Sequence, residues 1–156
     1  MVRVVRRGHL YFNSNTKQMN YIFANTWNGE GYSYLNTAEL VDTDNRMGFV
    51  KQKFSEQIDS DTKISNVEIE NRESTVLSYD IGFDSGTLQL IPYNDKPYGV
   101  VIWCNINEVS VLQTKEDYDN TLAEAIEHAD PDDDIDMENP FINAYSTDYD
   151  AQFIKF

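Results

Sequence analysis

Carboxylates dominate the chemistry that this sequence could perform, and they are concentrated between Glu116 and Asp150. This stretch contains thirteen acidic residues and neither Lys nor Arg, in a chain whose formal net charge is −15. Clustered carboxylates can coordinate a divalent cation, transfer protons, or attract a basic surface. The spacing of these residues and the structure that carries them distinguish the three possibilities.

The acidic run after residue 129 does not have the spacing of a calcium loop. Counted from Asp130, Asp132 and Asp134 fall at ligand positions, but Ile135 stands where glycine is required and Phe141 where the final glutamate is required. Glu124 and His128 lie one helical turn apart, yet the only other histidine is distant in sequence. We therefore predict neither a metal site nor a cofactor.

No other set of residues indicates an enzyme. Asp44, Asp61 and Lys63 are of the types found in metal-dependent nucleases, but the net charge would repel a nucleic-acid substrate. Cys104 follows the most apolar run of the chain, which is typical of an inert core thiol. The sequence has no nucleophile elbow, phosphate-binding glycine loop, dinucleotide fingerprint or zinc-ligand spacing. A protein that is not an enzyme is expected.

The carboxylates of the helix predicted over residues 115–129 are patterned. At about 100° per residue, four of them occupy roughly one third of the circumference, opposite an apolar stripe. They extend over about 16 Å of the axis, where duplex DNA carries about ten charges, so they imitate DNA only together with the following loop. The predicted partner-binding residues are Glu116, Asp117, Glu124 and Glu127 on the helix and Asp130, Asp132, Asp133, Asp134, Asp136 and Glu138 in the loop.

These residues favour a non-enzymatic acidic protein that binds a basic surface of a partner. The expected function is inhibition of a nucleic-acid-binding protein, of the DNA-mimic, anti-defence or immunity type. No motif is specific enough to assign a family. A competing interpretation is an acidic surface that only keeps the protein in solution. The sequence is also compatible with a small metal-dependent enzyme or nucleic-acid-processing factor, and with a phage or structural assembly subunit.

Composition sets the remaining bounds. A chain of 156 residues with 40% hydrophobic residues has the size and core content of one domain. Its single cysteine excludes an intrachain disulfide, and no apolar run is long enough for a membrane span. We expect a cytoplasmic protein that binds neither nucleic acid nor a membrane directly, with a homo-oligomer left open.

Hydrophobic periodicity predicts strands over most of the chain. The predicted strands are Val2–Phe12, Tyr21–Thr26, Tyr32–Leu40, a strand containing Val67 and Ile69, Val76–Phe83, Thr87–Ile91, Tyr98–Cys104, Glu108–Leu112 and the edge strand Ala151–Phe156. Turns are expected at Asn13–Thr16, Asn28–Gly31 and Asp84–Gly86. The aromatic and basic N-terminal strands fit ordinary strand composition better than a surface that stacks nucleic-acid bases.

Two helices are predicted with defined faces, and a third is expected after Asn139-Pro140. The first covers Asn45–Ile58, with Asp42 or Asp44 as its cap and an apolar face of Met47, Val50, Phe54 and Ile58. The second begins with a capping box of Thr114 and Asp117 and has the stripe Tyr118, Leu122, Ala125, Ile126 and Ala129. The fold class is therefore α+β: a single domain, 1–156, with a mainly antiparallel sheet of about six to eight strands, two to three helices and an acidic segment, 116–150.

Overall fold

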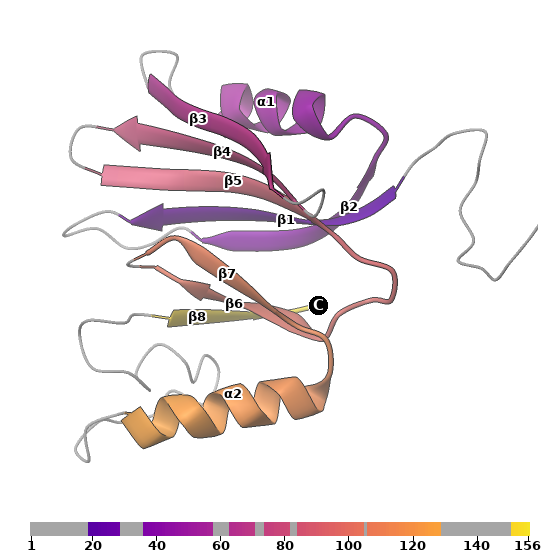
Figure 1. The fold of residues 1–156 in the computed structure, drawn as a ribbon, viewed down its shortest axis with the longest axis vertical. Helices are drawn as coiled ribbons and strands as arrows, with labels where there is room; N and C mark the ends of the chain where they lie inside the picture. Colours follow the sequence, from indigo (N-terminus) through magenta and orange to yellow (C-terminus); the bar gives the residue numbers. More distant parts are fainter. Residues whose placement is uncertain are drawn as a thin grey trace, which may run out of the picture.

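The computed structural model shows two antiparallel sheets stacked between two helices (Figure 1). It describes residues 19–28, 36–57, 63–70, 74–81, 84–104, 106–128 and 151–156. From one end of the long axis to the other, the layers are helix α1, a five-stranded sheet, a three-stranded sheet and helix α2. The predicted α+β class and its antiparallel pairing are confirmed.

The five-stranded sheet has the order β2-β1-β5-β4-β3. Its strands are β1 (Met19–Asn28), β2 (Thr37–Thr43), β3 (Lys63–Glu70), β4 (Ser74–Ile81) and β5 (Asp84–Pro92). Every neighbouring pair is antiparallel. β1 pairs with β2 on one side and, on the other, with β5, which is distant in the sequence. Alternation along β1 turns Tyr21 and Phe23 to one face and Ile22 to the other.

Helix α1 (Arg46–Gln57) covers the first of these faces. Val50 and Phe54 are buried against Phe23, and the Phe54 ring meets that of Tyr79 edge to face at a centroid distance of 5.9 Å. Both α1 residues were predicted to point inward, because they recur at helical spacing. Burial of each such apolar side chain stabilises the fold by about 1.5–3 kcal/mol.

The second face of the five-stranded sheet packs on the three-stranded sheet. That sheet has the order β7-β6-β8 and consists of β6 (Gly99–Trp103), β7 (Glu108–Leu112) and β8 (Ala151–Lys155). Ile22 of β1 and Val100 and Ile102 of β6 are completely buried in the shared core. β6 is covered on both faces, as its uninterrupted apolar run predicts.

Helix α2 (Lys115–His128) covers the outer face of the three-stranded sheet. Its Ala125 is completely buried, and Tyr118 and Leu122 pack beside it against Val101 of β6 and Phe153 of β8. The acidic helix is therefore held by an apolar face and does not stand free of the fold.

Two local predictions are corrected. Asp84–Gly86, expected as a turn, belongs to β5 and pairs with Tyr79–Ile81 of β4. A Cβ at position 86 would lie 2.4 Å from Tyr79 Oη, so Gly86 serves close packing within the sheet. Helix α1 is capped by Asn45, whose Oδ1 accepts the Gly48 N–H at 3.0 Å, and not by Asp42 or Asp44.

β2 extends three residues beyond the end of the predicted strand Tyr32–Leu40, and positions 32–35 of that prediction lie outside the described residues. Several predictions lie outside the described residues. They are the strand Val2–Phe12, the turns at 13–16 and 29–31, and the acidic loop and third helix between 129 and 150. Within the described ranges, no helix has both the length and the apolar character of a bilayer span. The assignment of residues 1–156 to one domain remains a prediction.

Candidate functional site

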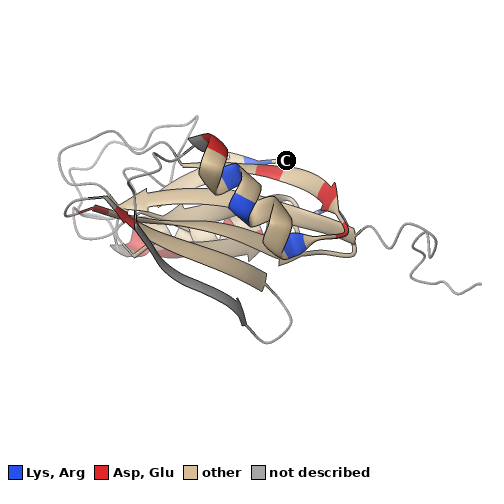
Figure 2. Ribbon diagram, turned by 90° about the horizontal axis from the view of Figure 1, so that it is seen from above, with Lys and Arg blue, Asp and Glu red and all other residues tan. Residues whose placement is uncertain are grey.

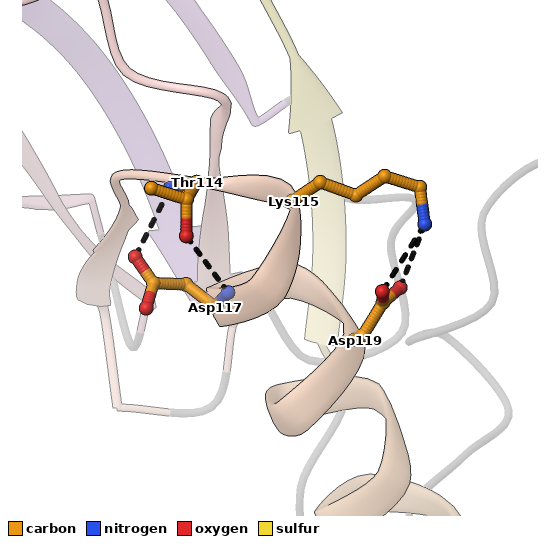
Figure 3. A network of polar contacts seen from close by, with 4 residues as sticks. All are labelled: Thr114, Lys115, Asp117 and Asp119. Atoms are coloured by element: carbon orange, nitrogen blue, oxygen red, sulfur yellow. Dashed lines mark hydrogen bonds and ion pairs between the residues drawn. The ribbon is translucent and has the colours of Figure 1, made fainter.

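The acidic helix α2 starts at a capping box formed by Thr114 and Asp117 (Figure 3). Thr114 Oγ1 accepts the Asp117 N–H at 3.1 Å, and Asp117 Oδ2 accepts the Thr114 N–H at 3.0 Å. The same carboxylate oxygen accepts the Gln113 N–H at 2.8 Å. These bonds satisfy backbone groups that a helix start otherwise leaves unpaired, which confirms the predicted box.

Two of the carboxylates on α2 are therefore engaged within the protein. Asp117 is half-buried and binds the backbone. Asp119 accepts two hydrogen bonds from Lys115 Nζ, at 2.9 and 3.2 Å, one turn away (Figure 3). The hydrogen bond to Asp119, reinforced by its charge, raises the pKa of Lys115. Asp117 and Asp119 thus present less charge to a partner than their number implies.

Three carboxylates on α2 remain turned outward. Glu116, Glu124 and Glu127 are exposed, and none has an ion-pair partner among the residues that the structure describes. Glu116 and Glu127 are eleven residues apart, which separates them by about 16 Å along the axis. The structure therefore brings three of the four predicted helical residues onto one accessible face. The six predicted loop residues, from Asp130 to Glu138, lie outside the described part of the chain.

The opposite face of α2 is anchored by aromatic rings. The Tyr118 ring lies 4.7 Å from that of Phe153 and 5.5 Å from that of Tyr98, centroid to centroid. Burial, followed by the influence of Tyr98, raises the pKa of Tyr118. Ile126 was predicted to join this face, but 47% of it is exposed, because it lies at the margin of the stripe.

Charge is distributed unequally between the two ends of the molecule. Helix α1 carries three basic residues, Arg46, Lys51 and Lys53, and one acidic residue, Glu56 (Figure 2), whereas α2 carries five acidic residues and one basic residue, Lys115. Lys53 Nζ lies 5.5 Å from the ring centre of Phe49 and 3.7 Å from Glu56. Since α1 and α2 form the outermost layers (Figure 1), a helix of net positive charge and a helix of net negative charge lie at opposite ends of the long axis.

The other candidate chemistry is dispersed. Cys104 is buried, and Asn36 Nδ2 donates to its Sγ at 2.8 Å. Tyr21 and Phe23 lie in the core under α1, so these two aromatic residues serve packing. In the described ranges, no group of three or more His, Cys, Asp or Glu side chains is placed to hold a metal ion.

Sequence reasoning missed a polar hollow between the two sheets. It has a volume of about 370 Å³ and is lined by Val76, Thr87, Gln89, Ile106, Asn107, Glu108 and Val109. These residues come from β4, β5, β7 and the turn that precedes β7. The sequence signal for this hollow was weak, because it consists of an asparagine in a turn. Asn107 has a φ of 54°, a conformation that asparagine tolerates there.

Comparison of the chain with protein-family models, with curated proteins and with solved structures gave no match.

Proposed function

We propose that this protein is a cytoplasmic, non-enzymatic interaction protein whose α2 surface binds a basic surface of a partner protein. The observation that carries the proposal is the arrangement of Glu116, Glu124 and Glu127. They are exposed on one side of a helix whose start is capped and whose other side is packed on a sheet. The backbone of α2 already holds these carboxylates in a row. Attraction of Lys and Arg on a partner therefore costs little conformational entropy beyond that of the three Glu side chains.

The partner that we favour is a nucleic-acid-binding protein, which the acidic surface would occupy as a decoy of the anti-defence or immunity type. Such a partner has the basic groove that this charge pattern complements. Three carboxylates over about 16 Å are sparse beside the roughly ten phosphates of duplex DNA. The proposal therefore assigns part of the contact to Asp130, Asp132, Asp133, Asp134, Asp136 and Glu138.

Charge reversal on α2 tests the proposal. Glu124→Lys with Glu127→Lys should abolish capture of the partner from the source organism's lysate. The matched control, Glu39→Lys with Asp95→Lys, changes the net charge by the same amount at exposed positions outside α2 and should retain capture. Lysines near a helix C-terminus are compatible with the helix dipole, so the fold should persist.

Two results would contradict the proposal. Equal loss of capture in both variants would indicate that only the overall charge matters, and unchanged capture in the α2 variant would remove α2 from the interface. Once the partner is purified, its affinity should fall steeply between about 50 and 200 mM salt, as expected when several charge pairs form on binding. Neutralising Asp132, Asp133 and Asp134 as asparagines would measure the contribution of the loop.

A further inference from the structure

We propose that the free edge of β7 binds an extended basic peptide, which adds a fourth strand to the three-stranded sheet. Within the described part of the chain, β7 pairs with β6 and forms one edge of that sheet. Such an edge presents unpaired backbone N–H and C=O groups to an incoming strand. The site is separate from the carboxylates of α2, so the inference goes beyond the proposed function.

The five-stranded sheet extends past this edge. β7 lies opposite β5, because Asn107, which precedes β7, donates to Ser85 Oγ at 3.2 Å, and Val109 packs in the same core as Ile91. No described residue of β4 belongs to that core. Neighbouring strands are about 4.8 Å apart, so β4 and β3 overhang the edge of β7 by about 10 Å. This width leaves room for one or two further strands.

The overhanging face of β4 is only partly covered. Leu77 and Tyr79 point toward α1 and are buried. Val76 and Ser78 point to the opposite face, where they are half-buried, and Asp80 on that face is exposed. A strand placed beside β7 would cover this face.

The hollow of about 370 Å³ lies at the inner side of this space. Val76 lines it together with Thr87 and Gln89 of β5 and Val109 of β7. These four side chains are uncharged and of moderate size. Valine or threonine at every second position of the peptide would therefore suit the inward-facing side.

The other edge of the three-stranded sheet has no comparable space. Gln152 Nε2 of β8 donates to the Asn36 carbonyl oxygen, immediately before β2, at 3.3 Å. β2 is itself the edge of the five-stranded sheet, so the two sheets end together on this side. A strand added to β8 would have no sheet to cover its inner face.

A second copy of this chain does not fit the space beside β7. Antiparallel pairing of β7 with β7 of another molecule would place both five-stranded sheets on the same side of the joined sheet. β4 of one copy would then occupy the position of β5 of the other. A single extended peptide brings no second layer and avoids this collision.

The charge around the edge favours a basic peptide. Glu108 and Asp80 are exposed, and the sequences of β4, β5 and β7 contain no Lys or Arg. Glu108 lies opposite Trp103 in the register, so its side chain is on the outer face of the sheet with Trp103 and α2. Lys or Arg on the outer face of the peptide would pair with Glu108 across the strands.

The test peptide is an acetylated and amidated heptapeptide in which valine alternates with lysine, added to the ¹⁵N-labelled full chain at constant ionic strength. Binding should slow hydrogen exchange at alternate backbone amides of β7 and shift the resonances of Val76 and Gln89. Two N-methylated forms, one methylated at the valines and one at the lysines, carry the same charge. Whichever direction the peptide runs, only one of these sets of N–H groups faces β7. One form should therefore bind at least about tenfold more weakly than the other.

Variants of the protein locate the peptide. Val76→Trp, which fills the space under the overhang, should weaken binding at least about tenfold, whereas Ser55→Trp at an exposed position of α1 should not. Glu108→Gln should weaken it about twofold to fivefold through loss of the cross-strand charge pair. Glu127→Gln removes the same charge from α2 and should leave it unchanged.

Four outcomes would overturn the inference. The first three are the absence of protection at millimolar peptide, equal binding of the two methylated forms, and equal weakening by Glu108→Gln and Glu127→Gln. The fourth is protection of all β7 amides before peptide is added. In that case, dependence on protein concentration would identify a second copy as the occupant, and its absence would identify another segment of the chain. Each of these outcomes leaves the α2 proposal intact, because that proposal is tested by capture of a partner protein.

Discussion

At the scale of single residues, one carboxylate on α2 has two possible uses. Asp117 lies on the acidic side of the helix, but its Oδ2 already accepts two backbone N–H groups. A carboxylate bound in this way is less free to turn toward a partner. Partner binding at the start of α2 therefore depends more on Glu116 than on Asp117.

Removal of the capping box should destabilise the protein. Thr114→Ala and Asp117→Ala should each lower the free energy of unfolding by about 1 kcal/mol, because each leaves backbone N–H groups without an acceptor. Urea denaturation measures both effects. Glu116→Ala, which removes a carboxylate outside the box, should change stability by less than about 0.5 kcal/mol. If Asp117→Ala is as neutral as Glu116→Ala, the box does not stabilise α2.

Tyr79 should make stability depend on alkaline pH. Burial raises its pKa to about 12, from an ordinary value of 10.0. The unfolded chain then releases this proton at a lower pH than the folded protein does. The contribution to stability is complete below about pH 10 and is lost as the pH rises toward about 12.

Urea denaturation between about pH 8 and 11 measures this dependence. Tyr79→Phe should flatten the decline of stability above about pH 10, because phenylalanine has no hydroxyl to ionise. Tyr98→Phe is a control, since it removes a less buried hydroxyl. A decline that is identical in Tyr79→Phe and in the unsubstituted protein would contradict the assignment.

At the scale of the elements, periodicity predicted both described helices and their inward faces. Periodicity was a weaker guide to residues at the edge of a buried helix face and to the ends of helices, because tertiary neighbours determine both. Ile126 lies close enough to the stripe to be counted with it, but it is 47% exposed and does not join the cluster of Tyr118, Leu122 and Ala125. Similarly, Asn45 caps α1 because β2 ends at Thr43, which no local propensity determines.

Leu122 and Ile126 of α2 should respond differently to substitution by a charged residue. Leu122→Glu should lower the free energy of unfolding by about 2 kcal/mol or more, because it places a carboxylate against the outer face of the three-stranded sheet. Ile126→Glu should have little effect, within about 0.5 kcal/mol, since that side chain is 47% exposed. Thermal unfolding followed by circular dichroism distinguishes them. Similar losses in both variants would place Ile126 in the core.

At the scale of the whole molecule, the layer order was beyond the reach of sequence patterns. Antiparallel pairing of β4 with β5 was predictable because a short connection joins them. The pairing of β1 with β5 was not, because it joins Tyr21 to Pro92. The patterned carboxylates of α2 were predictable from one helix. The hollow between the two sheets was not, since its lining comes from three separate segments.

The shared core predicts that the two sheets unfold together. The chain has two tryptophans, Trp27 in β1 and Trp103 in β6, so each sheet contains one fluorescent reporter. Trp27→Phe and Trp103→Phe variants should give the same urea midpoint once the effect of each substitution on stability is subtracted. Ile102→Ala, which opens a cavity between the sheets, should lower the free energy of unfolding seen by both reporters together, by about 2–5 kcal/mol. Separate transitions would divide the chain into two domains.

The placement of β1 between β2 and β5 has a consequence for the rate at which the protein folds. Neither sheet is assembled only from segments that are adjacent in sequence. β1 pairs with the distant β5, and β6 pairs with the distant β8, where Gly99 lies opposite Lys155. The chain must lose the entropy of closing these long loops before the pairings stabilise it. A high contact order of this kind is typical of folding in milliseconds to seconds. During that interval, the strong mutual repulsion of chains with net charge −15 would keep unpaired strand edges on different molecules apart.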